Sequence, residues 1–249
     1  MSGAEGWEDI DAFAKCTEDW LRKYLKLENG LPGHDGYGRV YRRLDPQQLE
    51  ICFMEWVQAM RLPLDREVFA VDGKTMRGSF DKFKCLKVAH IVSVYATGNR
   101  LTLAQVKTDE KSNEITAKHE VLALVALKGA IVTIDAMGCQ YKIADQIGAG
   151  GGDYLFSLKG NQEILHDDVE EYLKDVDFKK PDADIKVEVT HDVDHGRIER
   201  RIHAVSGNVG WLIERHPAWK TITSIGVIEA WRDINGVEST EKRYYRASL

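Results

Sequence analysis

The sequence has little of what marks secreted, disulfide-bonded or membrane proteins. Among its 249 residues are only four cysteines, and no two of them form a C-x-x-C pair, so neither a zinc knuckle nor a disulfide framework is expected. No run approaches the roughly 18 apolar residues of a membrane-spanning helix, and the N-terminus lacks the basic and apolar regions of a signal peptide. We therefore expect a cytoplasmic protein that does not enter the membrane.

A general excess of basic residues is also missing. The 34 Lys and Arg against 40 Asp and Glu give a net charge of −6, which argues against a simple nucleic-acid coat protein. The distribution is uneven, because residues 72–111 carry eight basic and four acidic side chains and residues 196–249 carry nine and six. Such basic segments fit a DNA-facing surface on an acidic body or ordinary solvated faces, and charge alone favours the second.

Hydrophobic periodicity predicts helices first and a sheet afterwards. The first helix is expected over apolar positions from Ile10 to Leu25, residues 29–36 break it with glycines and a proline, and Asp45 caps the next helix. Strands are expected at 68–71, 90–96, 101–107, 131–134 and 154–158, with helices at 116–128, at 141–147 and from an Asn161 cap. After Pro181 the pattern is β-rich, with Asn235-Gly236 as a hairpin turn. The order predicts an α/β fold with a mixed sheet and helices on its faces.

Two buried strands each end in an aspartate. The apolar run at 130–134 is followed by Asp135, and the shorter run at 68–71 by Asp72. Two carboxylates on neighbouring strands are what a divalent-metal phosphoryl-transfer site needs, because Mg²⁺ prefers a few hard oxygen ligands. Either aspartate alone fits a turn or helix cap equally well. The spacing does not separate a nuclease from a phosphatase or a kinase-like enzyme.

Small and basic residues accompany these aspartates. Gly73 and Gly138 would leave room for a substrate backbone to approach, and Lys74 and Arg77 stand where they could contact phosphates.

Two further clusters remain ambiguous. His191 and His195 have the spacing of some zinc ligands, but no second ligand pair accompanies them, which favours solvated or structural histidines. Arg197, Arg200 and Arg201 fit a phosphate-facing cluster or a solvated strand edge.

Five segments resemble the H-repeat-associated proteins, a family of DDE-type insertion-sequence transposases. They are residues 71–79, 111–115, 127–140, 152–162 and 195–199. Residues 29–35 are similar to the helical domain that precedes the catalytic domain in that family. The resemblance implies an RNase H-like core that acts on DNA with Mg²⁺ or Mn²⁺, in which Asp72 and Asp135 are metal ligands and the first two catalytic carboxylates.

The resemblance also implies a domain order. Residues 1–64 would be a partial helical transposase-associated domain, 65–180 the RNase H-like catalytic core, and 181–249 a β-rich insertion or extension. Relatives carry a third carboxylate on a helix after that insertion, in a His-Trp-x-Ile-Glu-Asn segment, and this sequence ends before such a segment. Glu199 is the local substitute to consider, with DNA contact or sheet structure as its alternative role.

The implied activity is metal-dependent DNA cleavage and strand transfer at insertion-sequence ends. The expected partners are double-stranded DNA and further copies of the chain during transposition, which implies a nucleoid-associated protein. Expected DNA contacts are Lys74, Arg77, Lys159, Arg197 and Arg200. One alternative is an inactive remnant that only binds DNA or a full-length relative, and another is a host nuclease on the same fold.

Overall fold

The computed structural model describes residues 4–76, 89–108, 114–174, 176–178, 180–194 and 197–249. The chain forms two compact units, Met1–Ala59 and Met60–Leu249. Within the described residues, no helix combines the length and the apolar character that a membrane crossing requires.

The first unit is built from helices. They are α1 (Trp7–Cys16), α2 (Glu18–Leu21), α3 (His34–Tyr41) and α4 (Pro46–Met60), whose last residue enters the second unit. The Asp45 cap is confirmed, because its Oδ1 accepts hydrogen bonds from the backbone N–H groups of Gln47 and Gln48 at 2.9 and 3.2 Å. The prediction of one continuous first helix was wrong, because the helix is interrupted at Thr17 between α1 and α2. Helix α3 begins inside the stretch expected to be a loop.

The second unit is centred on a nine-stranded mixed sheet of described residues with the order β3-β2-β1-β4-β5-β9-β8-β7-β6. Strands β1, β4 and β5 are parallel, and the other neighbouring pairs are antiparallel. The predicted α/β class with a mixed sheet is therefore confirmed. The strands are β1 (Val68–Met76), β2 (Ala89–Ala96), β3 (Leu101–Thr108), β4 (Ile131–Ile134), β5 (Asp153–Leu158), β6 (Ile185–Asp194), β7 (Arg197–Ser206), β8 (Ser224–Ile234) and β9 (Val237–Ala247).

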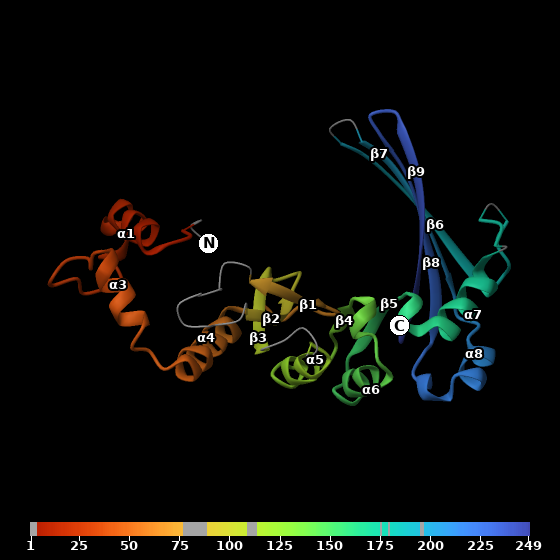
Figure 1. Ribbon diagram of the computed structural model, residues 1–249, viewed down its shortest axis with the longest axis horizontal. Coiled ribbons are helices and arrows are strands. Elements are labelled where there is room, and N and C mark those ends of the chain that lie inside the picture. The colour runs from red at the N-terminus through yellow and green to blue at the C-terminus, as the bar shows by residue number, and fades with distance from the viewer. Residues whose placement is uncertain (1–3, 77–88, 109–113, 175, 179, 195–196) are drawn as a thin grey trace. The chain divides into compact units, whose positions relative to one another are not determined.

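Helices cover one face of the central strands. Helix α5 (Glu114–Ala123) packs on β2 and β3, and α6 (Tyr141–Ala149) packs on β5, on the same side of the sheet (Figure 1). Successive strand residues point to opposite faces, and those under the helices are apolar and buried: Phe69, Val71, Val132, Ile134, Tyr154 and Phe156. The remaining helical segments are α7 (Glu163–Lys174), α8 (Gly210–Arg215), η3 (Ala136–Gly138), η4 (Gly160–Gln162) and η5 (Pro217–Trp219).

The β-rich C-terminal strands continue the core sheet. Strand β9 pairs with β5 from Leu155↔Ala247 to Leu158↔Tyr244, and the long strands β6 to β9 extend beyond β5 (Figure 1). Asn235 and Gly236 form the β8–β9 turn as predicted, both with positive φ. The Asn161 helix cap was wrong, because η4 precedes α7 and the Asn161 side chain instead donates to the carbonyl of Ala136 at 2.6 Å.

Candidate active site

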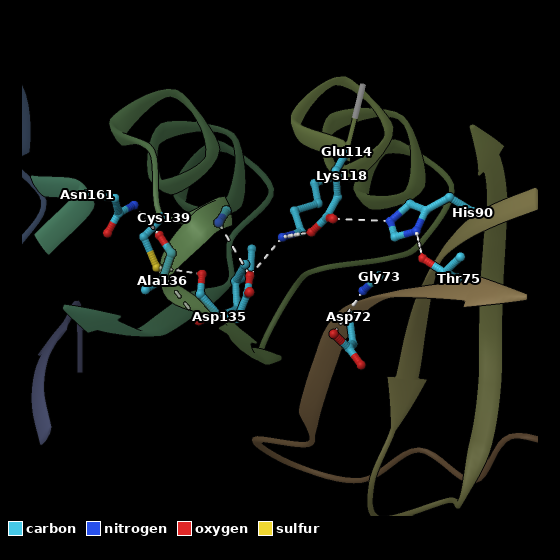
Figure 2. A network of polar contacts seen from close by, with 12 residues as sticks. Asp72, Gly73, Thr75, His90, Glu114, Lys118, Asp135, Ala136, Cys139 and Asn161 are labelled. Atoms are coloured by element: carbon cyan, nitrogen blue, oxygen red, sulfur yellow. Dashed lines mark hydrogen bonds and ion pairs between the residues drawn. The ribbon is translucent and has the colours of Figure 1, made fainter. Parts of the chain in front are cut away.

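Asp72 and Asp135 occupy equivalent positions beside the parallel pair β1 and β4. Asp135 follows the end of β4, whereas β1 continues to Met76 and Asp72 lies within it, so the strand expected at 68–71 is longer than predicted. The register of β1 and β4 runs to Val71↔Ile134, and each aspartate is the next residue along its chain. Neighbouring strands lie about 4.8 Å apart, so both carboxylates come to the same edge of the sheet (Figure 2). The structure therefore brings together the two aspartates that the sequence singled out.

These carboxylates open onto a hollow of about 480 Å³ on the sheet face turned away from α5 and α6. Its polar lining combines acids and bases from β1, the end of β4, the end of β5, and β9. The charged lining residues are Asp72, Asp135, Lys159, Glu241 and Arg243. Lys159 was among the expected DNA contacts, whereas Glu241 and Arg243 were missed because they reach the hollow only through the pairing of β9 with β5.

A buried lysine reaches Asp135 from the helix-covered side. Nζ of Lys118, on α5, lies 2.8 Å from Oδ1 of Asp135 and 2.7 Å from Oε1 of Glu114. The Lys118 side chain is 0% exposed, while that of Asp135 is 52% exposed. Burial lowers the pKa of Lys118, but the hydrogen bonds to Asp135 and Glu114 and their charges outweigh it, so the pKa is raised overall. Lys118 thus contacts Asp135 from the α5 side of the sheet, while Asp135 lines the hollow on the other side.

The polar contacts continue from Glu114 toward β1. Oε2 of Glu114 lies 3.1 Å from Nε2 of His90, and Nδ1 of His90 lies 3.0 Å from Oγ1 of Thr75 (Figure 2). His90 and Glu114 are both buried. We call His90, Glu114 and Lys118, together with the exposed Thr75 at their end, the buried polar chain. Its signal in the sequence is the i, i+4 spacing of Glu114 and Lys118 on an otherwise apolar helix face.

Two glycines leave the space that side chains of the buried polar chain occupy, which corrects the role we expected for these glycines. A Cβ on Gly73 would lie 2.8 Å from both Cδ of Glu114 and Nε2 of His90. On Gly138 it would lie 2.5 Å from Nζ of Lys118. The space beside each glycine is therefore filled by the protein's own polar side chains and is not left for a substrate backbone.

Glu199 is placed elsewhere. It is buried on β7, where Oε1 lies 2.9 Å from Nε of Arg232 and Oε2 pairs with Arg197 and, at 2.9 Å, with Arg201. The hydrogen bond from Arg232 is the main cause that holds the pKa of Glu199 below its usual value. Glu199 does not line the hollow that contains Asp72 and Asp135. The structure therefore does not bring Glu199 to the two aspartates. Its carboxylate oxygens instead contact arginines on β7 and β8.

The other expected contacts lie on exposed strand positions. Lys74 is exposed two residues beyond Asp72 on β1, and Arg197 and Arg200 are exposed on β7. Arg77 and His195 fall outside the described residues. Arg243, in the hollow, is held by Glu241, whose Oε1 lies 2.7 Å from its Nε.

The donor set fits a hard divalent cation. Asp72 and Asp135 offer carboxylate oxygens, the ligands that Mg²⁺ and Mn²⁺ prefer. The nearby Cys139 does not supply a soft thiolate ligand, because burial raises the pKa of its thiol to about 12 and keeps it protonated. Among the described residues, the one group of three ligand side chains within 4.8 Å is His166, Asp167 and Glu170 on α7, which includes neither aspartate. The fit therefore rests on two carboxylates.

Comparison with known families finds matches over most of the chain. The family model described as the transposase DDE domain matches residues 63–218. A second model, DDE_Tnp_1-associated, matches residues 1–57.

Individual proteins are similar over the whole chain. A protein of Xanthobacter autotrophicus, named only by its place in the dhlA 3′ region, is 38% identical over 249 residues. "H repeat-associated putative transposase YhhI" of Escherichia coli strain K12 is 40% identical over 252 residues. The match covers 100% of this chain in both cases, but 83% of the first relative and 66% of the second. "Inactive transposase YbfQ" of the same strain is 52% identical over 40 residues, 16% of this chain and 48% of that protein.

Proposed function

The chain belongs to the family of transposases with a DDE domain, and we propose that it cleaves DNA at insertion-sequence ends and transfers the freed strand. Membership in this family carries an RNase H-like fold and a divalent-metal requirement. The choice of Mg²⁺ or Mn²⁺ is part of the proposal. The observation that supports it most is the placement of Asp72 and Asp135, each one residue beyond the paired Val71 and Ile134.

In the proposed mechanism, Asp72 and Asp135 hold the metal. When bound, divalent ions activate the attacking oxygen and stabilise the leaving one. Lys159 and Arg243, in the same hollow, bind the non-bridging oxygens of the scissile phosphate through charge-assisted hydrogen bonds. Water attacks the phosphorus at the element's end and the P–O3′ bond breaks, which leaves a 5′-phosphate and a free 3′-hydroxyl. That hydroxyl then attacks a phosphorus of the target DNA, displaces the target's own 3′-oxygen and gives up its proton.

DNA binding outside the hollow is proposed for the exposed basic side chains. Lys74, Arg197 and Arg200 are exposed on strands of the same sheet, where they can contact backbone phosphates without reading base sequence. Arg77 belongs to the same set, although it lies outside the described residues. We propose that copies of the chain pair on DNA during transposition and that the protein associates with the nucleoid, where its substrate lies.

An inactive, DNA-binding form of the transposase is the second candidate. It is favoured by one observation, namely that no third ligand side chain joins Asp72 and Asp135 in a cluster among the described residues. Glu241 lines the same hollow, but both its oxygens contact Arg243 and one also contacts Arg232. Glu199 as the third carboxylate requires rearrangement of its three arginine contacts.

A nicking assay tests the proposal. Supercoiled plasmids with and without the element's inverted-repeat ends are incubated with the protein in Mg²⁺, Mn²⁺ or EDTA. We expect metal-dependent nicking that prefers the repeat ends and is lost in Asp72→Asn and Asp135→Asn. Asp182→Asn, at an exposed position between α7 and β6, is the matched control and should keep the activity. Binding without nicking under any metal supports the inactive form, and nicking without end preference supports the host nuclease.

A further inference from the structure

A fully buried ammonium in contact with a half-exposed carboxylate is an unusual arrangement. Lys118 is 0% exposed, Glu114 is 8% exposed, and both lie beneath the sheet edge that carries Asp135. Burying a lysine is unfavourable unless carboxylates that pair with it offset the loss of hydration. Glu114, four residues away on the same helix, already supplies a buried partner at 2.7 Å. The second contact, at 2.8 Å, ties the ammonium to a carboxylate at the hollow.

Within the part of the chain that the structure describes, the hydrogen bonds to the Asp135 carboxylate leave one of its oxygens without a donor. Among the described residues, the Asp135 side chain accepts hydrogen bonds from Nζ of Lys118 and from the backbone N–H of Gly138, at 2.8 and 3.3 Å. Both go to Oδ1. The rotation of the carboxylate is therefore fixed through one oxygen while Oδ2 remains for a ligand. Groups that hydrogen-bond a metal-binding side chain in this way commonly set its orientation and change metal affinity by about 10- to 100-fold.

The remainder of the buried polar chain fixes the lysine. Glu114 uses its second oxygen on His90, which in turn contacts Thr75 of β1. Thr75 lies three residues beyond Asp72 on the same strand. Gly73 and Gly138 keep the space that these side chains fill. The chain of contacts thus connects the strand of one site aspartate to the side chain of the other.

We propose that Lys118 is a positioning residue, held by Glu114, that orients the Asp135 carboxylate for metal binding. The proposal rests on the proposed function, because it takes Asp135 to be a metal ligand. Lys118 acts on the metal only through Asp135. A carboxylate fixed in advance loses less rotational freedom when it binds a ligand than a mobile one does.

The test is Mn²⁺ affinity, measured from the electron paramagnetic resonance signal of the free ion. The main variant is the double substitution Lys118→Met and Glu114→Gln. It removes one positive and one negative charge together, so the net charge of the site is unchanged and the loss of positioning dominates. A matched control is Arg61→Met with Glu67→Gln, a pair at 3.1 Å whose acid is 1% exposed and precedes β1. Circular dichroism and thermal unfolding establish that each variant folds.

We expect the Mn²⁺ Kd to rise about 10-fold in the Lys118/Glu114 variant, at the low end of the range for groups that orient a metal ligand. The Arg61/Glu67 control should keep the wild-type Kd even where its stability falls. Lys118→Met alone is the second variant if the double variant fails to fold. Loss of a positive charge would by itself lower the Mn²⁺ Kd, so a Kd that rises reports loss of positioning and a Kd that falls contradicts the proposal.

Three outcomes would overturn the proposal. A folded Lys118/Glu114 variant with the wild-type Kd removes the positioning role and leaves the metal site intact. An equal rise in the Arg61/Glu67 control makes the effect one of general stability. If the wild-type protein does not bind Mn²⁺, or binds it equally well after Asp135→Asn, the proposed function itself is overturned. This result is obtained before any Lys118 variant is made.

Discussion

Nζ of Lys118 lies 2.8 Å from Oδ1 of Asp135, although the lysine is 0% exposed and the aspartate 52% exposed. The contact crosses from the core beneath α5 to the hollow on the other face of the sheet. It links the packing of the helix to the carboxylate that we assign to the metal. Changes in the core near Lys118 should therefore reach the site, and the following predictions separate that route from general loss of stability.

Gly138→Ala should damage both the fold and the site. The new Cβ would lie 2.5 Å from Nζ of Lys118 and 2.6 Å from Cγ2 of Ile134, and such overpacking costs about 1–3 kcal/mol of unfolding free energy. Gly148→Ala is the matched control, because nothing lies within 4 Å of its Cβ position in α6. It should be neutral or stabilising by about 0.5 kcal/mol. Chemical denaturation measures both, and equal stability of the two variants would contradict the packing.

Cys139 should resist alkylation in the folded protein. Burial raises its pKa to about 12, and its thiol contacts the backbone oxygen of Asp135 at 3.1 Å. Cys16 and Cys52 are exposed and should react with iodoacetamide at pH 8. Peptide mass mapping before and after unfolding resolves each position, and rapid native labelling of Cys139 would refute its burial beside the site.

The same raised pKa has a consequence for stability in alkali. Between the ordinary thiol pKa of 9.0 and about 12, the unfolded chain loses the Cys139 proton while the folded chain keeps it. Folding stability should therefore fall as pH rises through this range. Cys139→Ala lacks this contribution, so its denaturation midpoint should depend less steeply on pH between 9 and 12 than that of the wild type.

Glu199→Gln should weaken the sheet and leave the metal site unchanged. The hydrogen bond from Arg232 and the charges of Arg197 and Arg201 keep the pKa of Glu199 below 4.5. Its contribution to stability is present above 4.5 and is lost as pH falls through the lowered value. The variant should melt below the wild type at pH 7, with a smaller difference in acid. Loss of Mn²⁺ binding without loss of stability would instead make Glu199 a metal ligand.

Arg243→Ala and Lys159→Ala should weaken DNA binding and reduce its salt dependence. Each lost phosphate contact lowers the slope of log K against log salt by about 0.9. Lys242→Ala is the control, since Lys242 is on the same strand but not among the residues that line the hollow and pairs with Glu229 at 3.3 Å. Fluorescence anisotropy at several salt concentrations measures the slopes. If Lys242→Ala changed the slope as much as Arg243→Ala does, the hollow would not be the site of phosphate binding.

Local pattern sufficed for the central strands and for the two aspartates. Apolar runs that end in a carboxylate mark Asp72 and Asp135, because a buried parallel strand needs no polar alternation. The sequence could not show that β9 returns to pair with β5, since a pairing over so many residues is set by tertiary packing. Glu241 and Arg243 were missed for that reason. Gly73 and Gly138 were assigned to a substrate because the side chains that fill their space come from α5 and β2.

The most direct test of the central claim is Mn²⁺ binding to the wild type, Asp72→Asn, Asp135→Asn and the Asp182→Asn control. If Asp72 and Asp135 hold the metal together, each of their variants should fold normally and lose at least about tenfold in affinity, while the control binds as the wild type does. Wild-type affinity in a folded Asp72→Asn or Asp135→Asn variant would contradict the assignment of these two aspartates as the metal site.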